Sequence, residues 1–502
     1  MPVTIRMAFR NILEHKAKSL IVGVLLALGV IILVLGNAFL DASKRGIQTS
    51  FTANYTADVI ITGKASGPVS LFGVQSIGGL DETPTVPDYE KVFAYAQALP
   101  GAESVTGSAS GFGIITREDT GLEEALEDEG DDEDMQSAFV MLFGVDALNY
   151  WTVFPKLEIV GGGRIEPGKP GIMIADDRLE KIGKRLKREL AVGDELLIQG
   201  IGATGMRLRS VPIVGTFRQP SEGASPEQLS YIDIDTLRVL SGMTVGAGES
   251  IKLGEEQTGL LAMDDLDALF GDDFFAMEES ASAEAADFDL AAILGDTSAR
   301  ERLNEADTGA WHSILIRLEA GQSAQLAAAR LNAWFAQEGI AAEAGDWQKA
   351  AGPYAQSVDV LRIVFTIAVI ILAVVAVIII MNTLVVSIIE RTGEIGTMRA
   401  LGAGKGFVRS MFMAETTALS LTFGLVGIVL AFVIVAVLNA IGIEASNQFF
   451  EILFGGKVLK AFVDPMSVVG SLILIVAVGI AAHFYPVAVA LRIQPVRAMQ
   501  TE

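Results

Sequence analysis

One glycine-rich segment of the 502-residue chain, Gly402-Ala-Gly-Lys-Gly406, has residue types that can cradle a nucleotide phosphate. A phosphate-binding loop of the P-loop kind also needs a glycine five residues before Gly404 and a serine or threonine after Lys405. Arg399 and Gly406 occupy these two positions instead, and the segment follows a long apolar run rather than a strand. We therefore predict that the chain itself does not bind nucleotide.

Residue types for catalysis or metal binding are scarce elsewhere. The chain has no cysteine and only three histidines, which excludes disulfides, thiolate metal sites and cysteine nucleophiles and disfavours a histidine-rich metal site. The densest acidic run, Glu118–Asp134, holds 11 acids in 17 residues but lacks the alternating spacing that wraps Ca²⁺. We expect no catalytic, cofactor or metal site. Residues 118–136 are interpreted as a solvated acidic insert, with a divalent-cation site as the alternative.

Four uncharged stretches are long enough to cross the ~30 Å hydrocarbon core of a bilayer as helices. They predict transmembrane helices at residues 19–40, 363–389, 416–443 and 466–491. The first is interpreted as a retained signal anchor, because its apolar part is too long for a signal peptide. The absence of Asp, Glu, Lys and Arg from these stretches disfavours an intramembrane ion or proton relay.

The short segments that flank these helices indicate the orientation of the chain. Residues 1–18, 390–415 and 492–502 share one side of the membrane if the chain crosses four times, and they hold ten Lys or Arg against five acids. We expect that side to be the cytoplasm, with both termini there and residues 444–464 as a short outer loop. Nucleic acid is not expected as a partner, because the net charge of the chain is -24.

The N-terminal segment, residues 1–18, has apolar residues at helical spacing with arginines on the other side. We expect an amphipathic helix lying on the inner leaflet, and a plain positively charged anchor is the alternative. The residues expected to face the lipid are Ile5, Phe9, Ile12 and Leu13.

The large segment at residues 41–362 is expected to fold as an extracytoplasmic α+β domain. A second insert, residues 254–307, mixes acids with large apolar residues; it is either a segment that folds against a partner or a subdomain of short helices. The periodicity predicts strands at 58–62, 137–145, 195–199, 211–217 and 311–318, and helices at 87–99, 176–190 and 322–337.

In the third stretch, small residues recur at helical spacing. Such stripes let neighbouring helices approach closely, so we expect helix packing here rather than a substrate path. The residues are Ser420, Gly424, Gly427 and Ala431.

The basic loop at residues 390–415 has the pattern of a helical hook. Glu390, Arg391 and Glu394 place charges about one turn apart, and Ile395 and Met398 give an apolar edge. A short helix with both features can lock into a groove on a soluble partner. We expect Gly402 and Gly404 to end this helix.

The run Glu390–Ala403, E-R-T-G-E-I-G-T-M-R-A-L-G-A, closely resembles the E-R-x-x-E-I-G-x-x-R-A-x-G-A signature of MacB/FtsX-type ABC transporter permeases. The opening Ala8–Ile12 is similar to the family's A-x-R-N-L. Phe484–Ala498 is similar to its closing P-A-x-x-A-x-x-x-x-P-x-x-A-L-R. It departs from this pattern at Val487, Val489 and Ala490, and Met499 stands near the usual final Leu-Arg. The order of one helix, a large domain and three helices extends the resemblance over the whole chain.

The resemblance implies a non-catalytic subunit of the bacterial inner membrane that works with a cytoplasmic ABC ATPase, which binds the ATP. It also implies a dimer with a second permease copy or paralogue. ATP-driven motion would pass through the membrane helices to the outer domain (mechanotransmission), which acts on lipoprotein, lipophilic or peptide cargo, with or without an adaptor protein. Alternatives are an FtsX-like regulator of cell-wall hydrolases and a permease that senses antimicrobial peptides. The residues implied to couple to the ATPase are Glu390, Arg391, Glu394, Ile395, Met398, Arg399 and Gly402.

Overall fold

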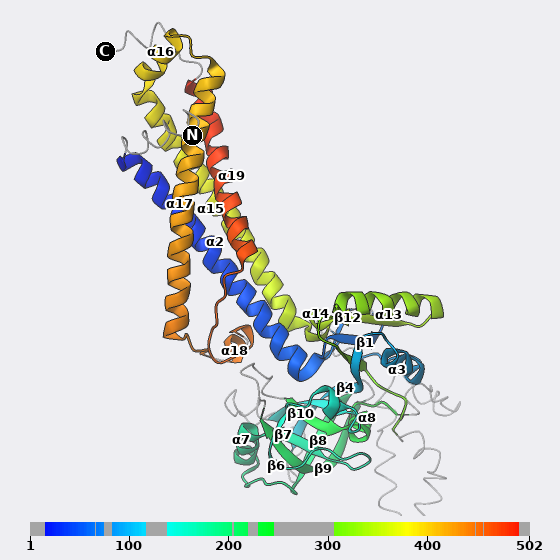
Figure 1. Cartoon of the computed structure of the whole chain (residues 1–502). Helices are drawn as coiled ribbons and strands as arrows, with labels where there is room; N and C mark the ends of the chain where they lie inside the picture. Colours follow the sequence, from blue (N-terminus) through cyan, green and yellow to red (C-terminus); the bar gives the residue numbers. More distant parts are fainter. Residues whose placement is uncertain are drawn as a thin grey trace, which may run out of the picture. The chain divides into compact units, whose positions relative to one another are not determined.

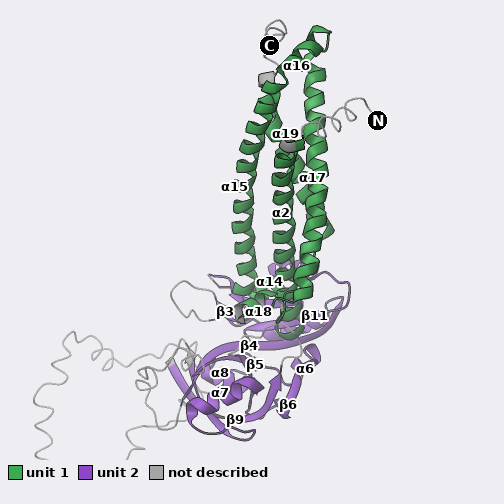
Figure 2. Cartoon of the chain, turned by 90° about the vertical axis from the view of Figure 1, so that its left-hand side faces the viewer, with its two compact units in different colours: residues 1–57, 219–226, 347–502 green, residues 58–218, 227–346 purple. Residues whose placement is uncertain are grey.

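The computed structural model of the chain describes residues 16–65, 67–74, 83–116, 138–202, 205–218, 229–244, 306–446, 448–454 and 456–490. The chain divides into two compact units (Figure 2). Unit 1 comprises residues 1–57, 219–226 and 347–502, and unit 2 comprises residues 58–218 and 227–346. Outside the described residues lie the acidic insert 118–136, nearly all of the insert 254–307, the tail 492–502, and Ile5, Phe9, Ile12 and Leu13.

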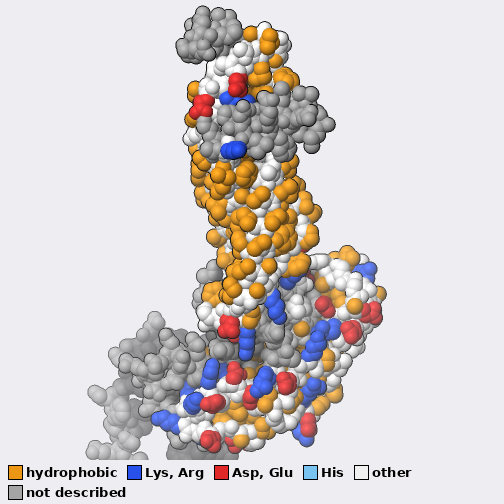
Figure 3. Space-filling model, turned by 60° about the vertical axis from the view of Figure 1, so that its left-hand side comes forward, with side chains coloured by type: hydrophobic (Ala, Val, Ile, Leu, Met, Phe, Trp, Pro, Cys, Tyr) orange, Lys and Arg blue, Asp and Glu red, His pale blue; other side chains and the backbone are white. Residues whose placement is uncertain are grey.

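Unit 1 is built from long helices. Within the described residues, four helices are long and apolar enough to cross a membrane. They pack side by side (Figure 1), and hydrophobic side chains cover their surface (Figure 3). They are α2 (Lys16–Phe51), α15 (Pro353–Glu390), α17 (Lys405–Ile441) and α19 (Pro465–Ala490).

The helices extend beyond the uncharged stretches that predicted them. α2 continues past Leu40 to Phe51 and into a π-helical turn, η1 (Thr52–Thr56), while α15 already begins at Pro353 and α17 at Lys405. Hydropathy marks only the part of a helix that lies in hydrocarbon, and charged residues can continue the same hydrogen-bonded ladder in water. Residues 41–57 and 347–362, which the prediction includes in the extracytoplasmic segment 41–362, belong to unit 1.

Among its described residues, unit 1 also has three short helices. α14 (Trp347–Ala351) precedes α15, α16 (Thr392–Ala400) joins α15 to α17, and α18 (Gln448–Phe454) lies between α17 and α19. α16 and α18 lie at opposite ends of the long helices (Figure 1). The predicted outer loop 444–464 thus contains a helix, and a bridge between Glu444 and Val458 closes it.

Unit 2 is a mixed sheet with helices. Ten described strands form the main sheet in the order β12-β1-β11-β4-β5-β10-β7-β9-β6, with β8 paired to both β4 and β9. The strands are β1 (Val59–Gly63), β4 (Ala102–Thr116), β5 (Phe139–Val145), β6 (Glu158–Gly162), β7 (Ile172–Ala175), β8 (Glu195–Gly202), β9 (Gly205–Arg218), β10 (Leu229–Asp233), β11 (Ser313–Leu318) and β12 (Ala342–Asp346), with a separate pair β2 (Val69–Ser70) and β3 (Gly73–Val74). The helices in the described part of unit 2 are α3 (Tyr89–Gln97), α6 (Tyr150–Val153), α7 (Asp176–Leu186), α8 (Ile234–Leu240) and α13 (Ala324–Glu338).

Two apolar cores lie along this sheet. One joins β1, β11 and β12 to α3 and α13, and the other joins β4, β5 and β7–β10 to α7 and α8. β1 is buried along its whole length, as expected of a strand paired on both sides and covered by helices. The predicted combination of four membrane helices and a large domain of strands and helices is confirmed.

Candidate functional site

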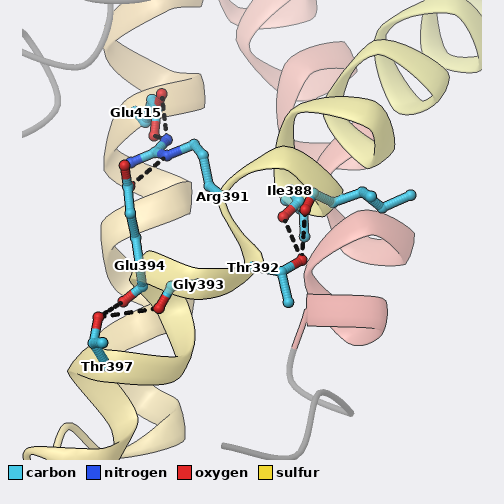
Figure 4. Close-up of polar contacts among 8 residues, drawn as sticks. Ile388, Arg391, Thr392, Gly393, Glu394, Thr397 and Glu415 are labelled. Atoms are coloured by element: carbon cyan, nitrogen blue, oxygen red, sulfur yellow. Dashed lines mark hydrogen bonds and ion pairs between the residues drawn. The ribbon is translucent and has the colours of Figure 1, made fainter. Parts of the chain in front are cut away.

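The segment that carries the signature motif is a short helix between two long ones. α15 ends at Glu390, Arg391 serves as the junction, and α16 starts at Thr392. The Thr392 hydroxyl donates to the carbonyl oxygens of Ile389 at 2.6 Å and Ile388 at 3.2 Å, which satisfies carbonyls left over at the end of α15 (Figure 4). Glu394 lies in the first turn of α16, where the helix dipole favours a negative charge.

Arg391 fixes this short helix to the next membrane helix. Its side chain is 7% exposed, and its Nε donates to Glu394 Oε2 at 3.1 Å. Its Nη1 donates to both carboxylate oxygens of Glu415, on α17, at 3.3 and 3.4 Å (Figure 4). The guanidinium also lies 5.8 Å from the ring centroid of Phe412. Because the cation is buried and paired on two sides, it orients α16 more firmly than a surface ion pair could.

An apolar cluster lies beneath α16. Ile395 is 1% exposed and packs with residues of α15, α17 and α19, while Met398 is partly buried against the same cluster. The expectation that Ile395 gives a partner an apolar edge is therefore wrong: this side chain attaches α16 to its own chain. The other buried members are Ile388, Val408, Met411, Phe412 and Val487.

α16 ends in a turn that exposes a leucine. Gly402 has φ +98°, a left-handed conformation that suits glycine. The Gly402 N–H donates to Arg399 O, and the Ala403 N–H donates to Met398 O, which together form a Schellman cap. Leu401 is the residue before this glycine, and it is 89% exposed.

The surface residues of this element differ from those predicted. Glu390 and Glu394 are exposed and Arg399 is half-buried, so these three can contact a partner. Arg391 and Ile395 are internal, and Leu401 was missed. A leucine directly before a capping glycine is the sequence signal that could have found Leu401, because the cap turns the chain away from the helix. The name tip is used for five residues at and around the end of α16. They are Leu401 and Gly402, which follow the helix, the exposed Glu390 and Glu394, and the half-buried Arg399.

The small-residue stripe of α17 lies in the helix contacts. Ser420, Gly424, Gly427 and Ala431 are all buried, and α17 packs against α2 and α19. A Cβ on Gly427 would lie 2.7 Å from the carbonyl oxygen of Ala27 on α2, and a Cβ on Gly424 would lie 3.1 Å from Leu472 on α19. The two glycines therefore permit the close approach of both neighbouring helices.

Two family descriptions match the sequence. The MacB-like periplasmic core domain matches residues 19–269, which is half of the chain, and the FtsX-like permease C-terminal domain matches residues 366–495. The second match contains α16, the Arg391 contacts and the tip.

Individual relatives match over shorter stretches. The macrolide export ATP-binding/permease protein MacB of Sodalis glossinidius is 30% identical over 123 residues, which are 24% of this chain and 17% of that protein. The uncharacterized ABC transporter permease YvrN of Bacillus subtilis is 34% identical over 123 residues, which are 24% of this chain and 26% of that protein. The aligned part is thus well under a third of these curated relatives.

Among solved structures, the periplasmic region of MacB from Actinobacillus actinomycetemcomitans is 10% identical and has a TM-score of 0.29. That match covers 60% of this chain and 94% of the other. The first match contains most of α2 and the strands β1–β10, and the second contains most of α15 and all of α17 and α19. This chain belongs to the MacB/FtsX-type family of ABC transporter permeases.

Proposed function

We propose that the chain is the membrane subunit of a transporter driven by a separate cytoplasmic ABC ATPase that docks on the tip. The observation that supports this most is Leu401, a leucine 89% exposed at the end of a helix that Arg391 holds in place. Burying such a side chain against a partner gains about 1.5–3 kcal/mol. The charges of Glu390, Glu394 and Arg399 around it would form the polar rim of that interface. ATP would bind and be hydrolysed on the partner.

The same geometry supports mechanotransmission. α16 is fixed to the end of α15, a 38-residue helix that would carry a displacement over about 57 Å at 1.5 Å per residue. α2 leads in sequence to β1, and β12 leads to α14 and α15. Because β1 and β12 are paired neighbours in the sheet, the two membrane helices connect to adjacent strands of unit 2. We propose that unit 2 lies outside the cytoplasm and acts there on lipoprotein, lipophilic or peptide cargo.

A second permease copy or a paralogue is part of this proposal. Only 6% of the apolar window of α15 is buried within the chain, whereas 39% of the window of α2 is buried. The large exposed side chains of α15 can contact lipid on one part of the helix and a second permease on another. They include Ile363, Val364, Ile367, Ile370, Ile371 and Val374.

A matched pair of exposed leucines tests the docking of the ATPase. Leu401→Asp places a charge in the centre of the proposed interface, whereas Leu148→Asp changes a leucine of unit 2 that is 73% exposed. At a hot-spot cost of about 2 kcal/mol, ATPase affinity should fall about 30-fold in the first variant. The full chain is purified from its own host, and the retained ABC ATPase and its ATP turnover are measured. Retention of the ATPase at the normal level in Leu401→Asp would contradict the proposal.

The absence of native cysteines allows a direct test of sidedness. Leu148→Cys and Leu401→Cys each introduce a single exposed thiol. In intact spheroplasts, a membrane-impermeant maleimide should label position 148 and should label position 401 only after the membrane is opened. The reverse pattern would overturn the proposed orientation.

A further inference from the structure

A charged cavity lies at the end of the long helices opposite to α16. It has a volume of about 490 Å³, within the range of small-ligand sites. All of its lining residues belong to unit 1. They lie on α2, α15 and α19, apart from Asp464, which directly precedes α19. The side chains that the argument uses are Asp41, Lys44, Arg45, Arg362, Asp464 and Ser467.

The cavity lies where three apolar segments meet water. Asp41 directly follows the uncharged stretch 19–40, Arg362 directly precedes 363–389, and Asp464 precedes the start of α19. The ends of membrane-spanning stretches lie at the depth of the lipid headgroups. Polar groups of a lipid can therefore reach this cavity without leaving the bilayer.

Two of the three cations in the cavity are already balanced by acids. Arg362 pairs with Asp41 at 3.0 Å, and the other oxygen of Asp41 accepts from the Ser467 hydroxyl at 3.1 Å. Arg45 lies 3.8 Å from Asp464 and 4.5 Å from the ring centroid of Phe462. Asp464 also caps α19, accepting from the backbone N–H groups of Met466 at 3.0 Å and Ser467 at 3.3 Å. These contacts connect α2, α15 and α19 and shape the cavity wall.

Lys44 is the third cation, and it forms no ion pair with any residue in the described part of the chain. With three cations against two carboxylates, the cavity has an excess of positive charge. The adjacent surface of α15 is apolar: Ile363 is 60% exposed and Ile367 is 54% exposed, next to Arg362 in the chain. Positive charge beside exposed hydrocarbon is complementary to a molecule with an anionic head and acyl chains.

We propose that this cavity binds the phosphate group of an anionic membrane phospholipid, whose acyl chains lie along α15. Lys44 and Arg45 contact the phosphate, and the Arg362–Asp41 pair holds the helices that enclose it. The proposal requires only that the four helices span a membrane, so it stands or falls independently of the ATPase and the cargo.

The test is lipid binding to the purified full chain, measured by native mass spectrometry with dioctanoyl phosphatidylglycerol. Dioctanoylglycerol, which lacks the phosphate, and inorganic phosphate are the two comparison ligands. Each cation near a lipid phosphate contributes about fivefold to affinity, so Lys44→Gln should bind about fivefold more weakly and Lys44→Gln/Arg45→Gln about 25-fold more weakly. Lys44→Gln breaks no ion pair among the described residues, so it decides the question if the double variant does not fold.

Arg409→Gln is the matched control, because Arg409 is an exposed cation near the start of α17, outside the cavity. It should bind phosphatidylglycerol as the unaltered chain does. Three results would overturn the proposal. They are equal binding of dioctanoylglycerol, unchanged binding in Lys44→Gln, and displacement of the lipid by an equal concentration of inorganic phosphate, which would identify a site for the free anion.

Discussion

Replacing Arg391 by methionine removes the cation that joins α16 to α17. The Glu415 carboxylate, 18% exposed, then stays in place without that guanidinium. Removing one partner of a buried pair costs about 3–5 kcal/mol, and the partial exposure of Glu415 reduces this to about 2–4 kcal/mol. At about 1.4 kcal/mol for each factor of ten, the detached population of α16 should rise about 30- to 1,000-fold. The tip would then lose its fixed position.

Hydrogen exchange of the backbone amides of residues 392–400, in the full chain in nanodiscs, measures this detachment. In Arg391→Met, these amides should exchange about 30- to 1,000-fold faster than in the unaltered chain. Arg391→Met/Glu415→Met removes both charges and keeps apolar volume beside Phe412, so it should recover most of the protection. Glu394→Gln should change exchange by less than about fivefold, because Glu394 is 63% exposed.

These variants show whether the buried Arg391–Glu415 pair or the exposed Arg391–Glu394 pair holds α16 in place. If Arg391→Met/Glu415→Met exchanges as fast as Arg391→Met alone, the pairing of the charges does not hold α16 in place. If Glu394→Gln has the larger effect, the exposed pair rather than the buried one positions the tip. Either result would refute the assignment of Arg391 as the residue that fixes α16.

Three further predictions concern other parts of the chain. Gly427→Ala should destabilise the folded chain by about 1–3 kcal/mol in a detergent unfolding titration, because its Cβ meets Ala27, whereas Gly470→Ala, with no neighbour within 4 Å, should not. Burial lowers the pKa of His312 from 6.5 to about 4; the unfolded chain thus binds the proton more tightly, and unit 2 should lose about 2 kcal/mol of unfolding free energy from pH 7 to pH 5. Urea unfolding at both pH values checks this, and His312→Gln should remove most of the difference. Deleting residues 118–134 should leave the amount of chain inserted in the membrane unchanged in a fractionation assay, and loss of the variant from the membrane fraction would show that the segment is structural.

The membrane helices could be predicted from the sequence because hydrocarbon imposes a length and an absence of charge. The described residues of each predicted stretch lie within one long helix, apart from Gly442 and Ile443 at the end of the third. The ends of the helices could not be found in this way, since residues such as Asp41 and Lys44 continue α2 with no change in backbone geometry. The charged cavity was missed for the same reason: apart from Met466 and Ser467, it is lined by residues beyond the predicted spans.

In unit 2, the local sequence pattern predicted some strands and missed others. β1 and β5 were predicted because each is a short, strongly apolar run. β4 spans Ala102–Thr116 and was missed, because its glycines, serines and alanines have weak strand propensity. Its pairing with β5, β8 and β11 stabilises it, and these partners are distant in sequence.

The sequence located the motif of the candidate site but did not predict which of its side chains are exposed. The spacing of Glu390, Arg391 and Glu394 indicated one charged helix, but in the structure Glu390 ends α15, Arg391 is the junction, and only Glu394 lies in α16. Which side chains point outward depends on the packing of α16 against α17, so Ile395 was assigned to the wrong side. Leu401 has no helical periodicity of its own, and its exposure follows from the cap that Gly402 forms.

Photo-crosslinking at position 401 tests the central claim most directly. Benzoylphenylalanine replaces Leu401 in one variant and Val386, 51% exposed on α15, in the control, and each full chain is irradiated in its native membrane. The account predicts that position 401 yields an adduct that contains an ABC ATPase subunit, identified by mass spectrometry, and that position 386 does not. An active complex with no ATPase adduct at position 401, or with an equal adduct at position 386, would contradict it.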